Sequence, residues 1–391
     1  MDPFLTSLRI GIDGDALRQP LSGVGHYIRS LCSELEELLP NAAMFAYSRL
    51  PASALSLPSR RWQLRSEPVP LFRRLPSFMW LKTRCRSICT PDKLDIFWAG
   101  RTLHPGSMEG VRIVSTVHDL NHLIVPDTMQ LPTRLSHRLW FEADVRSADC
   151  LITNSRGTAE RVRNLIGAHV HAVVLPGVAG RFSPAASTLN ADSSHFMARL
   201  GIAPPYLLSV ATPEPRKNLA ALLEAYVDLK MRGILAGYRL VLVGGHGWKN
   251  RVLERQLLAA EPYGVVRTGY VPDDMMPALY GAAEALVFPS LYEGFGMPVL
   301  EARASGTKVV VSDIPELREA GGTQAIVIEP SVAGICQGIL TAIARRSEEP
   351  EDVTRTHSWG KSAEQLAKVL LEAAHCSTAR KNSVLQHGAI V

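Results

Sequence analysis

The stretch Val287–Glu301, VFPSLYEGFGMPVLE, decides how the second half of this chain folds. It begins, together with Leu286, as the apolar end of a buried strand and continues into a turn rich in Gly and Pro. Pro298 suits the first turn of a helix, because its ring fixes φ and it has no amide hydrogen to leave unpaired. The stretch therefore predicts a strand, a tight turn and a helix start.

The turn between this strand and this helix is a candidate site for a phosphate group. Its glycines remove side chains, so backbone amides can face an approaching ligand, and the helix N-terminus adds partial positive charge. One carboxylate lies in the turn and another lies one turn into the helix. The residues concerned are Glu293, Gly294, Phe295, Gly296, Met297 and Glu301. A structural turn with two surface glutamates explains the stretch equally well when it is considered alone.

Length and composition predict two domains. The chain has 391 residues, of which 46% are apolar and 20% are charged. It can therefore bury more apolar residues than a single hydrophobic core usually contains. We expect a cleft between the two domains. The formal net charge of +5 is mild and does not by itself indicate nucleic-acid binding.

The sequence predicts a cytoplasmic protein. No apolar stretch is long enough to span a bilayer, and the start MDPFLTSLRIGIDG lacks the pattern of a signal peptide. The six cysteines are scattered; Cys85 and Cys89 form the closest pair, and there is no CxxC. Neither a disulfide framework nor a zinc site is indicated.

The segment Arg49–Arg86 is strongly basic. It carries nine bases against the single acid Glu67, and large apolar residues are interleaved with them. One interpretation is an amphipathic surface that rests on anionic membrane, where each base contributes about 1 kcal/mol. The other is a solvated, Pro-broken connection packed on the first domain.

The chain opens with a predicted strand, Leu8–Ile12, and a helix from about His26 to Leu38. Gly23 and Gly25 are expected just before this helix, where the backbone turns or approaches a ligand. They supply only two of the three glycines of a dinucleotide-binding motif. The DGD at Asp13–Asp15 resembles a metal-binding pair, but a strand-ending Asx turn explains it more simply.

Strands and helices alternate along the first half, which predicts a parallel sheet covered on both faces. The predicted strands are Met44–Tyr47, Asp95–Trp98, Arg112–Thr116, Cys150–Asn154 and Ala172–Leu175. His118 and Asp119 follow the strand Arg112–Thr116 at its carboxyl end, where open α/β sheets place their ligand sites. This position favours a functional His118 over a structural one.

After a linker rich in Ser, Ala and Pro, the pattern restarts with the strand Tyr206–Val210 and predicts a second doubly wound domain. The next turn, TPEPRKN, places Arg216 and Lys217 where a diphosphate could lie, and Asn218 can cap the following helix. The turn GGHGWKN follows the strand Arg239–Val243, and its glycines, Gly245 among them, allow close approach. Together with the turn that contains Glu293, these are three loops at strand ends. They favour a single site to which all three loops contribute.

Several pieces in order resemble the retaining nucleotide-sugar glycosyltransferases of family four. They are SGVGHY, STVHDLNHLIVPD, ATPEPRKN, LVLVGGHGW, GYVPDDMMPALYGAAEALVFPSLYEGFGMPVLEA and SGTKVVVSDIPELRE, and HSWGKSAEQLAKVL resembles the family's last helices. The similarity covers nearly the whole chain and is closest to bacterial O-antigen and exopolysaccharide mannosyltransferases. The sequence departs from the family at Pro315–Gly322, where PELREAGGTQA replaces a run ending in Gly-Asp.

The resemblance implies the GT-B fold, two Rossmann-like domains facing across a cleft. It assigns residues 1–185 to an acceptor-binding domain, 186–205 to a linker and 206–355 to a nucleotide-sugar-binding domain. Residues 356–376 would form a helix returning to the first domain, and 377–391 a disordered tail.

The resemblance also implies roles for the site residues. Arg216 and Lys217 would neutralise the donor diphosphate, assisted by the amides beside Gly296. Glu301 would hold the ribose hydroxyls and Glu293 would face the donor sugar. His118 would contact the sugar near the reacting carbon. The glycines Gly23, Gly25 and Gly245 would border the donor.

The family mechanism is expected to need no metal or other cofactor, since cations and amides stabilise the leaving group. Retention is explained in the family by front-face attack, in which the leaving phosphate oxygen takes the acceptor proton. The predicted reaction transfers a hexose from a nucleotide sugar to a lipid-linked or growing glycan. Mannose is the predicted hexose, and GDP-mannose is the predicted donor. Two alternatives are an inactive binding subunit of a polysaccharide assembly complex and another GT-B enzyme such as a sugar-nucleotide epimerase.

Overall fold

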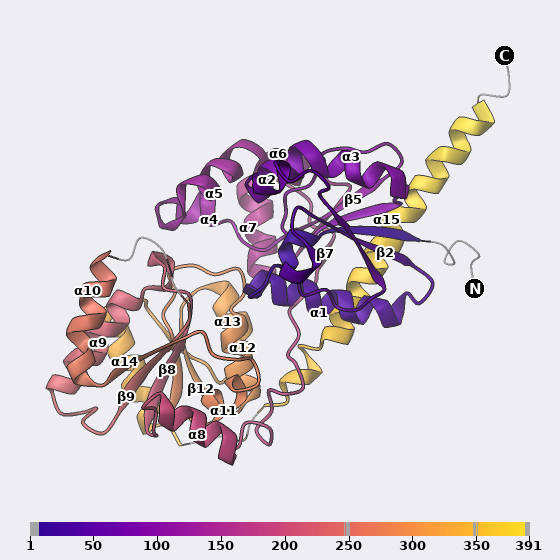
Figure 1. Cartoon of the computed structure of the whole chain (residues 1–391). Helices are drawn as coiled ribbons and strands as arrows, with labels where there is room; N and C mark the ends of the chain where they lie inside the picture. The colour runs from indigo at the N-terminus through magenta and orange to yellow at the C-terminus, as the bar shows by residue number, and fades with distance from the viewer. Residues whose placement is uncertain (1–7, 246, 248–250, 347–348, 350, 388–391) are drawn as a thin grey trace. The chain divides into compact units, whose positions relative to one another are not determined.

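The computed structural model describes residues 8–245, 247, 251–346, 349 and 351–387, with the backbone alone for 251 and 376–387. The chain forms two compact units (Figure 1). The first unit contains the chain up to Leu120, Leu131–Gly177 and the chain from His357 onward. The second unit contains Asn121–Gln130 and Val178–Thr356.

The first unit is built on a seven-stranded parallel sheet with the strand order β3-β2-β1-β4-β5-β6-β7. The strands are β1 (Arg9–Asp13), β2 (Ala43–Ser48), β3 (Trp62–Ser66), β4 (Ile96–Ala99), β5 (Arg112–Val117), β6 (Cys150–Thr153) and β7 (Ala172–Val173). Side chains of its central strands, such as Phe97 and Val114, are fully buried, as a parallel sheet with both faces covered requires.

Helices cover both faces of this sheet (Figure 1). The C-terminal helix α15 packs along α1 and against β5. The helical segments are α1 (Gly23–Leu38), α2 (Ser77–Trp80), η5 (Leu81–Cys85), α3 (Arg86–Cys89), α5 (Leu131–Ser136), η8 (His137–Phe141), α6 (Glu142–Ser147), α7 (Arg156–Ile166) and α15 (Trp359–His387). None of the helices in the described ranges has the length and apolarity needed to cross a membrane.

The second unit is built on a six-stranded parallel sheet with the strand order β10-β9-β8-β11-β12-β13. The strands are β8 (Tyr206–Val210), β9 (Arg239–Val243), β10 (Val265–Gly269), β11 (Ala285–Phe288), β12 (Lys308–Ser312) and β13 (Ile326–Ile328). One helical layer contains α9, α10 and α14, and another contains α11, α12 and α13 (Figure 1). The helices are α4 (Asn121–Ile124), α8 (Ala191–Arg199), α9 (Leu219–Met231), α10 (Arg251–Ala260), α11 (Met276–Gly281), α12 (Met297–Ala304), α13 (Pro315–Gly321) and α14 (Val332–Ala344).

The predicted α/β class with two doubly wound, Rossmann-like domains is confirmed. One helix boundary was wrong, because α1 begins at Gly23 and not near His26. Ser22 caps this helix by accepting a hydrogen bond from Gly25 N at 3.1 Å. Gly23 and Gly25 therefore lie in the first helical turn and not in the preceding loop.

Most bases of the segment Arg49–Arg86 are used inside the first unit, where the segment supplies β3 and the helical run α2-η5-α3. Four of them form ion pairs with carboxylates that are all buried. These pairs are Arg49 with Asp15 at 2.8 Å, Arg65 with Asp92 at 2.8 Å, Lys82 with Asp144 at 2.5 Å and Arg84 with Glu67 at 3.3 Å. Arg61 and Arg73 donate to backbone carbonyls. The segment thus packs on the first domain, as the second interpretation expected, but as a strand and a helical run and not as a solvated connection.

The chain crosses from the first unit to the second after Gly177 and returns after Thr356. The two crossing points are held together, because a Cβ at Gly177 would lie only 2.3 Å from Trp359 N. His357 Nδ1 lies 3.1 Å from the carbonyl oxygen of Pro176. Helix α15 continues to His387, beyond the boundary expected at residue 376, and residues 388–391 lie outside the described part.

Gly244 allows the loops after β8 and β9 to pack closely. A Cβ at Gly244 would lie 2.0 Å from the carbonyl oxygen of Ala211, a distance that no packed side chain can adopt. At Gly245 a Cβ would meet nothing within 4 Å. The first glycine is therefore required by the fold and the second is not.

We predict that Gly244→Ala lowers the stability of the second unit by about 2–4 kcal/mol, because the backbone must move to relieve the clash. Gly245→Ala is the matched control and should change stability by less than about 1 kcal/mol. Thermal unfolding of the two variants beside the parent checks this. Equal melting temperatures for Gly244→Ala and the parent would contradict it.

Candidate active site

Three loops at the carboxyl ends of neighbouring strands form the candidate site in the second unit. Strands β9, β8 and β11 are adjacent in the sheet, so the loops that follow them meet at one edge. Arg216 and Lys217 lie in η9 (Pro215–Lys217) after β8. Gly245 follows β9 and Glu293 follows β11.

Glu293 binds both cations. Its Oε2 accepts a hydrogen bond from Arg216 Nη1 at 2.7 Å, and its Oε1 accepts one from Lys217 Nζ at 2.6 Å. Arg216 Nη2 also donates to Glu214 Oε1 at 2.5 Å. Glu293 and Glu214 are 6% and 5% exposed, so two buried carboxylates face two cations. The sequence indicated the cations and Glu293, but it did not indicate Glu214, whose only signal is its place two residues before Arg216.

The charged groups of this cluster shift one another's pKa values. Burial alone would raise the pKa of Glu293, but Arg216 and Lys217 outweigh it and lower the pKa to about 2. Burial lowers the pKa of Lys217, while Glu293 opposes that shift. Burial raises the pKa of Glu214. Glu293 is therefore ionised throughout the neutral range and orients both cations before any ligand arrives.

Glu301 has a different environment from Glu293. It lies on α12, is half-buried, and accepts a hydrogen bond from the hydroxyl of Tyr280 at 2.9 Å. Burial raises the pKa of Glu301 to about 7, although Tyr280 and Arg181 act in the opposite direction. The carboxyl group consequently changes its protonation near neutral pH.

The turn before α12 is shaped by Gly296. This residue is the N-cap of α12 and has a φ of 106°, a backbone angle that residues other than glycine rarely adopt. A Cβ there would also lie 2.6 Å from a methyl carbon of Leu317. The helix begins at Met297, one residue before the predicted start, and its first amides have no partner within the helix. Residues 292–296 of the turn are all buried, backbone included.

The sequence predicted that the Asn218 side chain caps α9, and this was wrong. It occupies the N-cap position with φ of 55°, but its side chain makes no capping hydrogen bond. Its Nδ2 donates instead to the carbonyl oxygens of Pro289 and Pro330, at 3.2 and 2.8 Å. The residue ties the loops of the site together.

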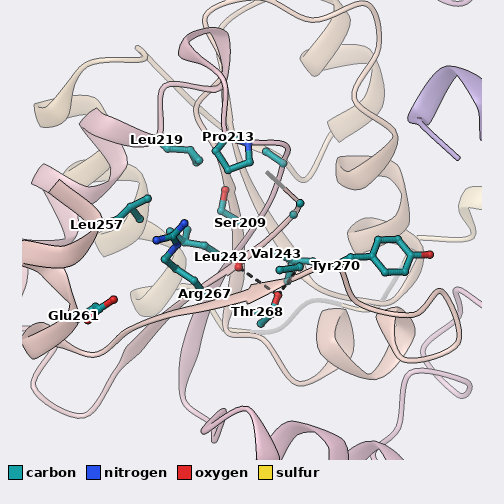
Figure 2. A pocket seen from close by; sticks show the side chains of 14 residues that line it. Ser209, Pro213, Leu219, Leu242, Val243, Leu257, Glu261, Arg267, Thr268 and Tyr270 are labelled. Atoms are coloured by element: carbon teal, nitrogen blue, oxygen red, sulfur yellow. Dashed lines mark hydrogen bonds between the residues drawn. The ribbon is translucent and has the colours of Figure 1, made fainter. Parts of the chain in front are cut away.

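A pocket of about 550 Å³ adjoins this edge of the sheet. Figure 2 shows the side chains that line it, with Ser209, Leu242 and Thr268 near its centre and Tyr270 at one end. Gly245 is part of its wall. The lining from the end of β10 was not among the predicted site residues. Residues 246 and 248–250 of the same loop lie outside the described part.

His118, Gly23 and Gly25 belong to the first unit, and the other predicted site residues belong to the second. His118 follows β5 and is 8% exposed. Its Nε2 lies 2.6 Å from the carbonyl oxygen of Gly100 and so carries the proton that is donated. The ring packs edge-on against Tyr27 at 5.1 Å. Burial lowers the pKa of His118, which leaves a neutral ring with Nδ1 as the acceptor.

The two glycines of α1 differ in what surrounds them. A Cβ at Gly25 would lie 2.8 Å from the carbonyl oxygen of Ala16, so the fold itself requires a glycine there. A Cβ at Gly23 would meet nothing within 4 Å. Only Gly23 keeps an open approach to the backbone.

The DGD turn of the first unit is used for ion pairs. Asp13 binds Arg101, and Asp15 binds Arg49 at 2.8 Å. Asp15 N also donates to Asp13 Oδ1 at 3.1 Å, as in an Asx turn. Among the described residues there is no group of three or more side chains that could hold a metal ion.

Two family comparisons cover most of the chain. Residues 21–178 match the family described as "Glycosyltransferase Family 4". Residues 204–345 match the family described as "Glycosyl transferases group 1". The first match contains His118, and the second contains the cluster of Arg216, Lys217 and Glu293.

Similar proteins agree with these matches. The chain is 29% identical over 347 residues to "O-antigen chain mannosyltransferase B" of Escherichia coli, a match that covers 84% of this chain and 89% of the relative. It is 30% identical over 156 residues to "O-antigen chain mannosyltransferase RfbU" of Salmonella typhimurium, which covers 39% of this chain and 42% of that one.

Solved structures show the same fold at low sequence identity. A structure of WaaG, titled "a glycosyltransferase involved in lipopolysaccharide biosynthesis", has a TM-score of 0.66 at 15% identity and covers 95% of this chain and 100% of its own. The Anabaena protein HepE in complex with UDP and glucose has a TM-score of 0.61 at 15% identity, with 97% and 100% covered. The domain matches, the relatives and the two parallel sheets agree, and this chain belongs to the family 4 glycosyltransferases with the GT-B fold.

Proposed function

We propose that this glycosyltransferase moves mannose from GDP-mannose to a lipid-linked or growing glycan of a bacterial surface polysaccharide, with retention of configuration. The observation that carries the proposal is the cluster of Arg216, Lys217 and Glu293 at the edge of the second sheet. The similarity to O-antigen mannosyltransferases over 84% of the chain supports the choice of sugar and of acceptor class.

The cation cluster would stabilise the leaving group. When the bond between the sugar and the diphosphate breaks, negative charge develops on the phosphate oxygen. Arg216 and Lys217 are already oriented by Glu293 at 2.7 and 2.6 Å, so little reorganisation is needed as this charge appears. The amides at the start of α12 would add further donors. In this proposal the chemistry is done by the chain's own residues, without a metal ion.

The proposed reaction is a front-face displacement. The acceptor hydroxyl oxygen bonds to the anomeric carbon as the carbon–oxygen bond to the diphosphate breaks. The proton of the acceptor passes to the leaving phosphate oxygen, so GDP leaves on the face that the acceptor enters. The neutral His118, with Nε2–H held by Gly100, would present Nδ1 as an acceptor for a sugar hydroxyl.

The nucleoside would be held by Glu301 and by the pocket beside Gly245. An ionised Glu301 can accept hydrogen bonds from two ribose hydroxyls. The pocket of about 550 Å³ is large enough for a purine base, and its wall includes the polar side chains of Ser209 and Thr268. The first unit would bind the acceptor at the cytoplasmic face of the membrane, where the protein would be peripheral.

The function is tested directly by adding sugar nucleotides to the purified full chain. GDP-mannose should raise the melting temperature more than UDP-, ADP- or dTDP-sugars, since a ligand at about 100 times its dissociation constant stabilises by about 2.7 kcal/mol. Transfer should continue in excess EDTA, and proton NMR of the product should show the anomeric configuration of the donor. Loss of transfer on chelation, restored by Mg²⁺, would overturn the metal-free mechanism. An inverted product would overturn retention.

Lys217→Ala and Glu293→Gln should separate binding from chemistry. Removing Lys217 should lower turnover by about 100-fold or more, because a donor to the developing charge is lost. Glu293→Gln should also lower turnover, because the cations lose their fixed orientation. It should leave donor affinity equal or tighter, because it removes a negative charge beside two cations.

Titration calorimetry with the donor and steady-state rates measure this difference. Lys368→Ala, an exposed lysine of the first unit, is the matched control and should behave as the parent. If Glu293→Gln loses affinity and turnover in equal proportion, Glu293 acts as a structural clamp of the loop and not on the reacting charges.

Donor affinity should rise with pH through the pKa of Glu301. A carboxyl group with a pKa of about 7 is ionised to about 10% at pH 6 and about 90% at pH 8. Only the ionised form accepts both ribose hydroxyls, and a sugar diphosphate does not titrate in this range. The dissociation constant should therefore fall by about tenfold from pH 6 to pH 8.

Glu301→Gln provides the control for this pH dependence. The variant should bind the donor more weakly at pH 8 than the parent, and its dissociation constant should not change between pH 6 and pH 8. A parent protein without pH dependence would show that Glu301 does not contact the ribose as an anion.

A further inference from the structure

The carboxyl group of Glu301 is held by a tyrosine whose own position is fixed. The hydroxyl of Tyr280 donates to Glu301 Oε2 at 2.9 Å, and the side chain of Tyr280 is fully buried. Thr307 Oγ1 donates to the carbonyl oxygen of Tyr280 at 2.6 Å, which fixes the end of α11. The tyrosine therefore orients one oxygen of the Glu301 carboxyl group from inside the second unit.

A row of contacts continues from Tyr280 to an exposed cation in the loop between β7 and α8. The ring of Phe182 packs edge-on against the ring of Tyr280, with 5.9 Å between their centres, and is 3% exposed. The guanidinium group of Arg181 lies over the Phe182 ring, 4.9 Å from its centre. The row holds this positive charge close enough to Glu301 to act on its ionisation.

Asp273, in the loop before α11, competes for this cation. Its Oδ2 lies 3.9 Å from Arg181 Nη2, near the outer limit of an ion pair. Its Oδ1 accepts a hydrogen bond from the hydroxyl of Tyr270 at 3.4 Å. Tyr270 lies at one end of the pocket (Figure 2). Asp273 thus connects the pocket proposed for the base with the residues around Glu301.

These neighbours act on the charge of Glu301 in opposite directions. The Tyr280 hydroxyl and the positive charge of Arg181 both lower the pKa of Glu301, whereas the negative charge of Asp273 raises it. The side chains of Arg181 and Asp273 are 45% and 47% exposed, so solvent and salt weaken their effects. The hydrogen bond from the buried Tyr280 is not weakened in this way.

We propose that Tyr280 and Arg181 are positioning residues that keep Glu301 ionised and oriented for the donor ribose, and that Asp273 limits this effect by pairing with Arg181. The inference rests on the proposed function, in which Glu301 binds the ribose hydroxyls. Each of the three residues acts through Glu301 and not on the reacting atoms. Together they set the pH range in which the donor binds.

The charge of Glu301 can be measured without any ligand. Carbon-13 NMR of the full chain, labelled at the glutamate carboxyl carbons, follows each group with pH, and Glu301→Gln identifies the signal that belongs to Glu301. Tyr280→Phe should raise its titration midpoint by about one pH unit, because the donated hydrogen bond is lost. Arg181→Gln should raise the midpoint and Asp273→Asn should lower it, each by about half a unit, since both charges are partly exposed.

Salt distinguishes the two kinds of contact. In about 1 M salt the shifts caused by Arg181→Gln and Asp273→Asn should shrink, because exposed charges are screened. The shift caused by Tyr280→Phe should remain. Arg181→Lys keeps the positive charge and should titrate as the parent does.

Two further variants are controls for general effects on the second unit. Tyr206→Phe removes another buried tyrosine hydroxyl, which donates to the backbone of α11 at 2.7 Å, and should leave the Glu301 midpoint unchanged. Arg232→Gln breaks a comparably exposed ion pair with Asp228 at the C-terminal end of α9. It should also leave the midpoint unchanged.

Two results would overturn the proposal. One is a Glu301 midpoint that stays the same in a folded Tyr280→Phe variant. The other is a pair of variants, Arg181→Gln and Asp273→Asn, that leave the midpoint unchanged or move it in the same direction. This second test stands by itself if Tyr280→Phe does not fold, because both of its side chains are partly exposed.

Titration calorimetry with GDP-mannose distinguishes this proposal from the proposed function. At pH 7 a one-unit rise in the midpoint lowers the ionised fraction of Glu301 from about 50% to about 10%, so Tyr280→Phe should bind the donor about fivefold more weakly. At pH 9 the variant and the parent should bind alike. Midpoints that move as expected without any change in donor affinity would contradict the ribose contact and leave the positioning residues standing. Donor binding that depends on pH in the parent, with midpoints that do not move in the variants, would contradict the positioning residues alone.

Discussion

The salt bridges of Glu293 with Arg216 and Lys217 are the interaction on which the second unit's functional edge depends. They join the loop after β8 to the loop after β11, two adjacent strands of one sheet. Without the anion, two cations would face each other in a nearly buried position, which is costly. With it, the two loops hold a fixed shape in which each cation is paired, Arg216 with Glu293 and Glu214 and Lys217 with Glu293.

The same stretch of sequence contains two glutamates whose surroundings give them opposite properties. Glu293, between two cations, has a pKa of about 2, whereas burial raises the pKa of Glu301 to about 7 even though a tyrosine hydroxyl donates to it. A separation of eight residues across a turn and a helix start is enough to produce this contrast. Glu293 is charged throughout the neutral range, and Glu301 changes its protonation within that range.

The sequence predicted the fold well because parallel sheets have strong local signals. The strands Tyr206–Val210 and Arg239–Val243 are short apolar runs bounded by turn residues, and both were found at their predicted positions. Strand β3 was missed because it lies inside a basic segment interrupted by prolines, although WQLRS alternates apolar and polar residues as a half-exposed strand does. Its Arg65 pairs with Asp92, and nothing local in the sequence marks a partner 27 residues away. The role of Glu293 as a partner of both cations was hidden for the same reason, since 76 residues separate it from Lys217.

The two crossings between the units have a consequence for how such chains can be rearranged. Except for the short segment Asn121–Gln130, the second unit is one continuous insertion into the first. Its entrance and exit are held side by side, by Gly177 against Trp359 and by His357 against Pro176. Adjacent ends make an inserted domain easy to exchange or to permute circularly, because the host needs only one small gap. Apart from Asn121–Gln130, the second unit can thus be exchanged as one continuous segment, while α15 remains part of the first unit.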